Sequence, residues 1–314
     1  MKIDKTVETV TSRYFYPQGN PRLRWFALWY FALLITLWTI LGHTLLGFEQ
    51  SFAQPVVGVV SACLTQWLLE WVDAKSKGRL PRYAGGFRNA VNFLLPAWIP
   101  GLAVAMLLYP NDRLWPIAYA ASLSIASKVL FRAPINHTSQ HVFNPSNFGI
   151  TTTLLMFPWI GLAPPYHFTE NVTGIWDWAI PGVILVSGIF LHATCTGRLP
   201  LCLAWLSGFL LQAAIRCAVF DLPWQVPLVP MTSAAFILFT LYMIPDPATT
   251  PLNPRRQVMF GLAVAAVYGL LQALHVVFGL FIALFAVCAL RGMGLYLVAL
   301  YKRWSISVAG EAMG

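Results

Sequence analysis

The sequence predicts an all-α membrane protein that crosses the bilayer about ten times. Of its 314 residues, 58% are hydrophobic and only 10% are charged, and the mean hydropathy is +0.66. Soluble domains carry about 25% charged residues, so this chain has too few charges to cover a water-soluble globule of its size. The 13 tryptophans also suit a protein with aromatic belts at both membrane interfaces.

Ten apolar runs supply the predicted crossings, each of which takes about 20 residues as a helix. The runs cover residues 25–46, 55–71, 90–108, 115–130, 147–160, 178–193, 199–219, 230–244, 257–274 and 276–300. Two of them, 115–130 and 147–160, are shorter than this. A shorter run can still cross where the helix is broken and surrounded by protein. We predict a single membrane domain at 25–303, with a first half at 25–160 and a second half at 178–300.

The positive charges favour one orientation of this path. When the N-terminus is placed inside, most of the 20 Lys and Arg residues fall in the inner segments, as is typical of cytoplasmic loops. We therefore predict that residues 1–24 and the tail 304–314 are cytoplasmic and that the protein lies in a bacterial cell (inner) membrane. The formal net charge of +9 follows from this topology and requires no nucleic-acid partner.

The ten crossings divide into five and five around the outer loop 161–177. An odd number of crossings in each half means that the two halves enter the membrane from opposite sides. This arrangement predicts an inverted repeat, with broken helices that build a site near the bilayer midplane. No residue-level repeat accompanies it, so the prediction depends on the number of crossings.

Two polar stretches interrupt the apolar pattern, and we call them the first and the second break. The first break reads HVFNPSNFGITTTLLMFP, residues 141–158. A residue that precedes proline disfavours the helical conformation, so the Asn144-Pro145 step is predicted to end the preceding span. Ser146 or Asn147 is then predicted as the N-cap of the helix that follows.

The second break reads YMIPDPATTPLNPRR, residues 242–256. Its four prolines forbid a continuous helix, and Asp246 lies between two of them, with Thr249 and Thr250 close behind. Either the two breaks are turns exposed to the cytoplasm, or they meet and bind a ligand. Hard oxygen ligands of this kind suit a small cation or the polar edge of a ligand. The similar pattern of the two breaks favours the second interpretation.

The same two stretches resemble the signature regions of the NqrB/RnfD family. The family pattern opens one helix with FNPA and closes another with TDP followed by TTPRG. Here these regions read Phe143-Asn144-Pro145 and Asp246-Pro247, followed by Thr249-Thr250-Pro251, and TGRLPL at 196–201 resembles the basic turn between later spans. The family comprises the large membrane subunits of the sodium-pumping NADH:quinone oxidoreductase and of the Rnf electron-transport complex. The chain most resembles the short, stand-alone branch found beside enediyne biosynthesis genes in some bacteria.

The resemblance implies ten helices, a bound flavin and electron transfer coupled to cation movement, as in a subunit of a membrane oxidoreductase. We predict that the cofactor site is formed by residues of the two breaks and by two basic residues near them, namely Asn144, Pro145, Ser146, Asn147, Thr249, Thr250, Lys128 and Arg132. We predict that Asp246, as a hard oxygen ligand, binds the ion or ligand. The implied partners are membrane lipid and other redox subunits or quinone. No catalytic residue and no metal site is predicted.

One departure from the family concerns how a flavin is held. Family members carry S-G-A-T in the outer loop after the fifth span, and its threonine holds FMN through a phosphoester bond. The corresponding loop, residues 167–178, has Trp176 where the acceptor threonine should stand, and leaves Thr173 as a weak candidate. We therefore expect FMN or riboflavin to be bound non-covalently. The alternative is a transporter or channel for a small solute or ion that keeps the scaffold and lacks the redox activity.

Other polar residues carry weaker signals. His137 and His141 have the i, i+4 spacing of a helical metal pair, but no third ligand is evident and Pro134 argues against helix, so a solvated loop is favoured. Arg291 lies within an apolar run, where it could pair with a buried anion such as a phosphate. The five cysteines are scattered without metal-ligand spacing.

Overall fold

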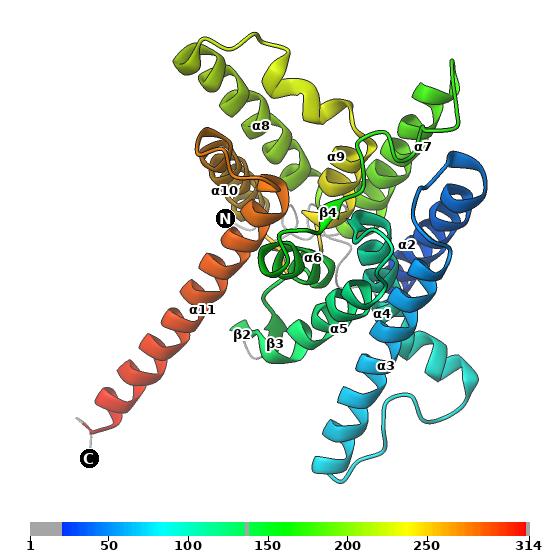
Figure 1. Ribbon diagram of the computed structural model, residues 1–314. Coiled ribbons are helices and arrows are strands. Elements are labelled where there is room, and N and C mark those ends of the chain that lie inside the picture. Colours follow the sequence, from blue (N-terminus) through cyan, green and yellow to red (C-terminus); the bar gives the residue numbers. More distant parts are fainter. Residues whose placement is uncertain (1–20, 136–137, 312–314) are drawn as a thin grey trace.

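The computed structural model describes residues 21–135 and 138–311, and these are mostly helical (Figure 1). The α-helices are α2 (Pro21–Leu41), α3 (Ala53–Ser76), α4 (Phe87–Leu107), α5 (Trp115–Leu130), α6 (Pro145–Met156), α7 (Trp176–Leu191), α8 (Leu199–Phe220), α9 (Ala234–Leu238), α10 (Pro254–Ala273) and α11 (Gly279–Glu311). The π-helical segments η2 (Gly42–Leu46), η3 (His192–Thr196) and η5 (Phe239–Met243) and the 3₁₀-helix η4 (Val226–Thr232) extend or precede them. The predicted class, an all-α polytopic membrane protein, is confirmed.

Two small antiparallel sheets, which the sequence did not predict, complete the fold. One pairs β1 (Leu108–Tyr109) with β4 (Gly161–Leu162), and the other pairs β2 (Arg132–Ile135) with β3 (Thr138–His141). The β2–β3 hairpin replaces the solvated loop expected around His141, which pairs with Arg132. His137, most of the predicted N-terminal segment and the end of the predicted tail lie outside the described residues.

Seven helical segments in the described part of the chain are long and apolar enough to cross a membrane. They are Arg22–Leu46, Ala53–Ser76, Phe87–Leu107, Trp176–Thr196, Leu199–Phe220, Pro254–Ala273 and Gly279–Tyr301. The pair Val226–Thr232 and Ala235–Met243, bent by 77°, makes eight if it is one broken span. The 12 residues of α6 extend about 18 Å as a helix, well short of a bilayer core of about 30 Å. The count of ten crossings and the inverted repeat stay predictions.

The first helix of each predicted half ends in the same way. The π-helical η2 and η3 each finish at a left-handed glycine, Gly47 with φ 86° and Gly197 with φ 64°. Only glycine adopts this conformation freely, so both helices stop at the residue that allows the turn. This correspondence is one that an inverted repeat would produce.

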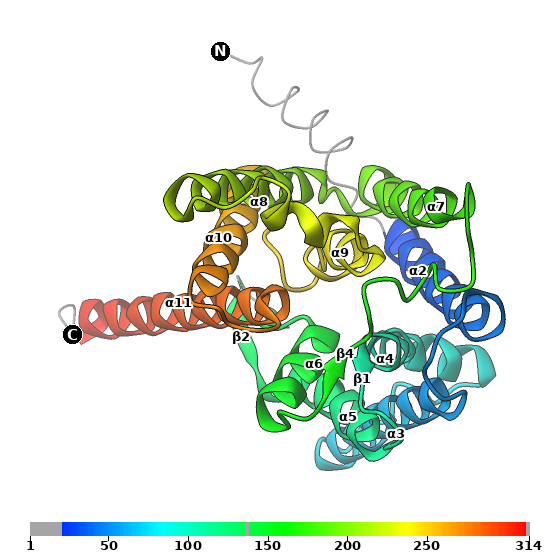
Figure 2. The ribbon, with the colours of Figure 1, turned by 45° about the horizontal axis from the view of Figure 1, so that its top comes forward.

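Neighbouring helices approach each other closely at glycine residues. Helix α6 lies among α4, α5 and α11 (Figure 2). A Cβ atom on Gly149 of α6 would lie 2.1 Å from Ser124 Oγ and 2.2 Å from the Ala120 carbonyl oxygen, both on α5. Likewise, a Cβ on Gly58 of α3 would lie 2.5 Å from the Gly101 carbonyl oxygen of α4. Small residues at such contacts let helices pack tightly where the hydrophobic effect between them is weak, as it is in lipid.

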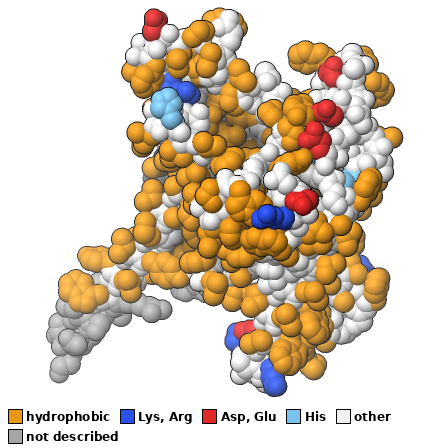
Figure 3. Space-filling model, viewed as in Figure 1, with side chains coloured by type: hydrophobic (Ala, Val, Ile, Leu, Met, Phe, Trp, Pro, Cys, Tyr) orange, Lys and Arg blue, Asp and Glu red, His pale blue; other side chains and the backbone are white. Residues whose placement is uncertain are grey.

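The surface of the molecule is largely apolar, as lipid contact requires (Figure 3). Large side chains such as Leu33, Val186 and Leu211 are more than half exposed on three different helices. In Figure 3 the acidic side chains lie mainly over the upper part of this face, and basic side chains lie at its upper left, in its centre and at its lower end near α3.

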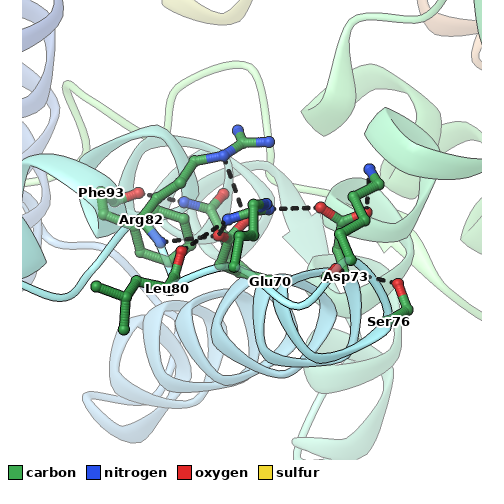
Figure 4. Close-up of polar contacts among 9 residues, drawn as sticks. Glu70, Asp73, Ser76, Leu80, Arg82 and Phe93 are labelled. Atoms are coloured by element: carbon green, nitrogen blue, oxygen red, sulfur yellow. Dashed lines mark hydrogen bonds and ion pairs between the residues drawn. The ribbon is translucent and has the colours of Figure 1, made fainter.

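An ionic cluster fixes the loop between α3 and α4 (Figure 4). Glu70, a buried residue of α3, accepts hydrogen bonds from Arg79 Nη1 at 2.6 Å and from the Arg82 backbone N–H at 2.8 Å. Arg79 also pairs with Asp73, whose second oxygen lies 2.6 Å from Lys77 Nζ. The hydrogen bonds that Arg79 donates to the carboxylates of Glu70 and Asp73 raise the pKa of its guanidinium above the usual range. The loop is therefore a fixed part of the structure.

Candidate functional site

The two breaks are in direct contact. The side-chain amide nitrogen of Asn144 donates a hydrogen bond to the Met243 carbonyl oxygen at 2.9 Å, and both residues are buried. Asn144 precedes α6 and Met243 ends η5, so the bond joins the first break to the second across 99 residues of sequence. The two breaks therefore meet, and ligand binding at their junction stays a prediction.

Asn144, rather than Ser146 or Asn147, caps helix α6. Its backbone is extended, with φ −58° and ψ 124°, as expected for a residue before proline. Its Oδ1 accepts the Asn147 backbone N–H at 3.1 Å and the Ser146 hydroxyl at 2.9 Å. Pro145 then occupies the first helical turn, where its missing N–H removes no helical bond. The predicted cap was displaced because the pre-proline residue has the cap conformation itself.

Asn147 connects the first break to α11. Its side-chain nitrogen donates to the Phe281 carbonyl oxygen at 3.1 Å, and the Thr151 hydroxyl donates to the same oxygen at 3.3 Å. The Asn147 side-chain oxygen is buried and has no hydrogen-bond partner. An unpaired buried acceptor is costly, so this oxygen is the most evident free ligand atom of the first break.

The prolines of the second break free four backbone carbonyls. In an α-helix the carbonyl of residue i accepts the N–H of residue i+4, and proline has no N–H. Four carbonyls therefore have a proline at position i+4. They belong to Leu241 (before Pro245), Met243 (before Pro247), Pro247 (before Pro251) and Thr250 (before Pro254). A buried carbonyl oxygen without a hydrogen bond is costly, so these oxygens need donors from elsewhere in the protein.

Three buried side chains supply those donors. His192 Nε2 lies 2.5 Å from the Leu241 oxygen and donates to it, because a carbonyl oxygen can only accept. The Asn144 side-chain amide donates to the Met243 oxygen. Arg198 Nη2 donates to the Pro247 oxygen at 3.1 Å and to the Thr250 oxygen at 3.4 Å. The polar residues around the break thus satisfy the backbone that the prolines disrupt.

Asp246 holds the turn between the prolines. One carboxylate oxygen accepts the Ala248 backbone N–H at 3.2 Å, and the other accepts the Thr249 hydroxyl at 2.9 Å. The Asp246 carbonyl oxygen accepts the Thr250 hydroxyl at 2.6 Å. The carboxylate is half-buried, and its remaining lone pairs are available to a ligand, since a carboxylate offers about four acceptor sites.

Two arginines surround this turn. Arg198 is fully buried, and its Nε donates to the Thr250 hydroxyl oxygen at 2.9 Å. Arg291 of α11 donates from Nη1 to the Thr249 carbonyl oxygen at 2.8 Å, so the arginine considered for a buried anion serves a backbone oxygen instead. The sequence placed Arg198 only in a cytoplasmic turn. Its position between two apolar runs, directly after a glycine, was the available signal.

Lys128 approaches the site from α5. Its Nζ donates to the Pro96 carbonyl oxygen at 2.9 Å and to Gln66 Oε1 at 3.4 Å. The Pro96 oxygen lacks its helical partner because residue 100 is also a proline. Lys128 interacts electrostatically with Asp246. The predicted cofactor residue therefore serves a carbonyl oxygen that lost its helical partner in α4, and it lies within electrostatic range of Asp246.

His141 and Arg132 border the site on the β2–β3 hairpin. Burial lowers the pKa of the His141 imidazole, as do Lys128 and Arg132, while Asp246 opposes this shift. The Arg132 side chain is exposed and is bound within the hairpin, with Nε 3.1 Å from Ser139 Oγ and Nη1 3.1 Å from the Lys128 carbonyl oxygen. The structure thus places Arg132 beside the breaks and gives it no hydrogen bond to them.

Thr173, the weak candidate for covalent flavin, is exposed in the loop before α7. In Figure 1 this loop runs from β4 to the upper right of the molecule, whereas the β2–β3 hairpin lies below α6. Within the described residues, no three His, Cys, Asp or Glu side chains are placed to hold a metal ion.

The segment that carries Arg198 and the second break is similar to a known family. Residues 163–281 match the model of the NQR2, RnfD, RnfE family. The match supports the predicted NqrB/RnfD family. The match includes the outer loop with Thr173, the Arg198 turn and the second break, while the first break lies outside it. No individual curated protein is significantly similar to the chain. Membership of the short, stand-alone branch stays a prediction.

NqrB/RnfD proteins are membrane subunits of multi-subunit complexes that couple electron transport to ion translocation. The family match and the apolar helices together make this chain a multi-pass membrane protein. The orientation of its termini and the type of cell membrane stay predictions.

Proposed function

We propose that the chain is a membrane subunit of a flavin-dependent electron-transport complex coupled to cation translocation, with a flavin held non-covalently where the two breaks meet. The observation that supports this proposal most directly is the hydrogen bond between Asn144 and Met243. It joins the two regions in which the sequence resembles NqrB/RnfD proteins, and the family match covers the second of them.

The polar groups beside the junction, an acceptor and a cation, suit the polar edge of a flavin. The Asp246 carboxylate has acceptor capacity for a ring N–H, and Lys128 brings a cation that interacts with it. A bound flavin would supply the capacity to accept and donate electrons singly or in pairs. In this proposal, Lys128 stabilises negative charge at the ligand, and Asp246 orients it.

Other predicted cofactor residues act on the protein and not on the ligand. The hydroxyls of Thr249 and Thr250 donate to Asp246, and the Asn144 amide is used by Met243. We assign these three residues a positioning role: they hold Asp246 at the junction. The unpaired side-chain oxygen of Asn147 is the remaining acceptor from the first break.

The exposed Thr173 supports non-covalent binding of FMN or riboflavin. A phosphoester at Thr173 would leave the flavin on the loop before α7, which runs to the upper right of the molecule, whereas α6 and the breaks lie in its middle (Figure 1). Helix α7 begins at Trp176, where the acceptor threonine of the family would stand. A cation pathway at Asp246 would use its carboxylate together with hard oxygen atoms of the break.

A visible absorption spectrum of the detergent-purified protein tests the proposal. We expect flavin absorption that passes entirely into the supernatant on acid precipitation. Asp246→Asn should remove most of the bound flavin while the protein stays monodisperse. Asp221→Asn is the matched control, because Asp221 is exposed and its positive φ of 51° suits asparagine as well.

Two results would overturn the flavin proposal: a colourless monodisperse wild-type protein, or an Asp246→Asn variant with full flavin content. Fluorescence that stays on the protein band in a denaturing gel would instead refute non-covalent binding.

The second candidate is a transporter or channel for a small solute or ion. It is favoured by the outer loop without an acceptor threonine and by hydroxyls of Thr249 and Thr250 that are already engaged. Cation flux into protein-containing liposomes, without added electron donor and sensitive to Asp246→Asn, would support this candidate.

A further inference from the structure

Two aromatic side chains anchor the outer loop, which joins β4 to α7. The His167 ring stacks on Phe48, with 3.5 Å between ring centroids, and the Phe168 ring meets Phe48 edge-on at 5.0 Å. All three side chains are buried. One backbone hydrogen bond, from the Asn171 N–H to the Leu46 carbonyl oxygen at 3.2 Å, also joins the loop to the end of η2. The position of the loop therefore depends on the contact between His167, Phe168 and Phe48.

The stacked imidazole has no hydrogen-bond partner among the described residues. Both ring nitrogens of His167 are buried and unpaired, and the side chain is only 3% exposed. A second imidazole, His43 of η2, lies 5.4 Å from Phe48 between ring centroids. Its Nδ1 donates to the Thr39 carbonyl oxygen at 2.9 Å, so Nε2 of the neutral ring carries no proton, and this atom is also buried and unpaired. We call His43, Phe48, His167 and Phe168 the histidine box.

The histidine box accommodates His167 only as a neutral ring. A proton on His167 would create a charge with two N–H donors that no acceptor reaches, and burying an unpaired charge costs far more than burying a neutral imidazole. A proton on His43 would add repulsion. Burial first, and His43 next, lowers the pKa of His167 to about 4.

No carboxylate among the described residues compensates for such a charge inside the box. The other titratable groups on the elements that pack around it are Glu49, Tyr109, Tyr166, Glu170, Asp177 and Tyr242. The three carboxylates are exposed, and none of them is hydrogen-bonded to either imidazole. A protonated His167 therefore gains water and exposed carboxylates when the loop moves outward.

We propose that the outer loop is an acid-operated latch: a proton taken up by His167 breaks its stack on Phe48 and releases the loop from the end of η2. In an open loop the imidazole takes up a proton near its ordinary pKa of about 6.5. In the closed loop it does so only near pH 4. The closed loop is therefore favoured at neutral pH, and this preference is lost as the pH falls through that interval. Buried histidines operate pH switches in this way.

The reactivity of two adjacent cysteines reports the position of the loop. Val172 is half-buried and packs against the same hydrophobic cluster as Phe48 and Phe168, whereas Thr173 is exposed. Val172→Cys changes the size of the side chain little, and Thr173→Cys is the matched control for the effect of pH on thiol chemistry. Each is made in the full chain with Cys63 and Cys217 replaced by serine. The detergent-purified proteins are treated with dithiodipyridine, which also reacts in acid.

Acid should expose Val172→Cys selectively. Its rate, divided by that of Thr173→Cys, should rise by about fivefold or more when the pH is lowered from neutral to about 4.5. His167→Phe keeps an aromatic ring that cannot take up a proton, so the ratio should stay low at both pH values. His167→Leu replaces this variant if it does not fold. His275→Asn removes an exposed histidine and should open as the wild type does.

The native Cys202 distinguishes opening of the loop from unfolding. It is buried in α8, so its reaction reports loss of the whole fold. Three results would overturn the proposal. They are a ratio that does not change with pH, an equal rise in His167→Phe, and a rise that Cys202 matches. The last result would show that acid unfolds the protein as a whole.

Discussion

The Asn144 side-chain amide lies 2.9 Å from the Met243 carbonyl oxygen and donates to it. Met243 needs this donor because residue 247, which would serve it in a helix, is a proline. The same side chain caps α6 through its oxygen. One asparagine thus starts one helix and completes the end of another, and the junction of the two breaks depends on both of its atoms.

Substitutions of Asn144 should separate these two functions. Asn144→Ala removes the cap, at about 1 kcal/mol, and leaves a buried acceptor unpaired, at about 1 to 3 kcal/mol. Asn144→Ser keeps a neutral cap oxygen and loses the amide donor, so its thermal midpoint in detergent should fall between those of the wild type and Asn144→Ala. A wild-type midpoint for Asn144→Ser would show that the bond to Met243 does not contribute to stability.

Arg198 should tolerate no replacement, including lysine. Its guanidinium serves the Thr250 hydroxyl and the Pro247 carbonyl at once, and a single ammonium group cannot reproduce this fork. We expect Arg198→Lys to cost at least about 2 kcal/mol and to lower the yield of monodisperse protein. Arg255→Lys, an exposed change at the start of α10, is the control and should behave as the wild type. Equal yields for the two variants would contradict the prediction.

The predicted topology can be tested by labelling single cysteines in whole cells. Thr173 and Ser76 are both exposed and lie in segments predicted to be outside and inside. In a background where Cys63 and Cys217 are serine, Thr173→Cys should react with an impermeant maleimide and Ser76→Cys should react only after lysis. The reverse pattern would invert the orientation.

His167 should make the outer loop sensitive to acid. Burial, followed by the neighbouring His43, lowers the pKa of His167 to about 4, and its ring stacks on Phe48 at 3.5 Å. The unfolded chain takes up this proton near pH 6.5 and the folded chain near pH 4. The free energy of unfolding is therefore complete above pH 6.5 and falls by on the order of 3 kcal/mol as the pH drops towards 4.

His167→Phe should remove this component, which thermal midpoints at several pH values between neutral and acid will measure. His275→Asn is the control, because His275 is exposed and its positive φ of 56° accommodates asparagine. A pH profile that is unchanged in His167→Phe would assign the acid sensitivity to other groups.

Much of this fold was predictable from local sequence. The apolar runs set the positions of the helices, because a run of about 20 apolar residues is stable as a helix against lipid or against the protein core. The prolines at 245, 247, 251 and 254 determined that helix stops there, since a missing N–H is a property of the residue itself. The family motifs lie in the same two breaks.

Tertiary structure alone decided which side chains repair those breaks. His192, Asn144 and Arg198 reach the freed carbonyls from 49, 99 and 49 residues away, and a sequence pattern contains no such distances. The tertiary structure also shows that the hydroxyls of Thr249 and Thr250, which were predicted for the cofactor site, bind Asp246. The proline pattern fixes how many backbone oxygens lose their partner, but the donors come from wherever packing brings a buried N–H within about 3 Å, and packing depends on the whole chain.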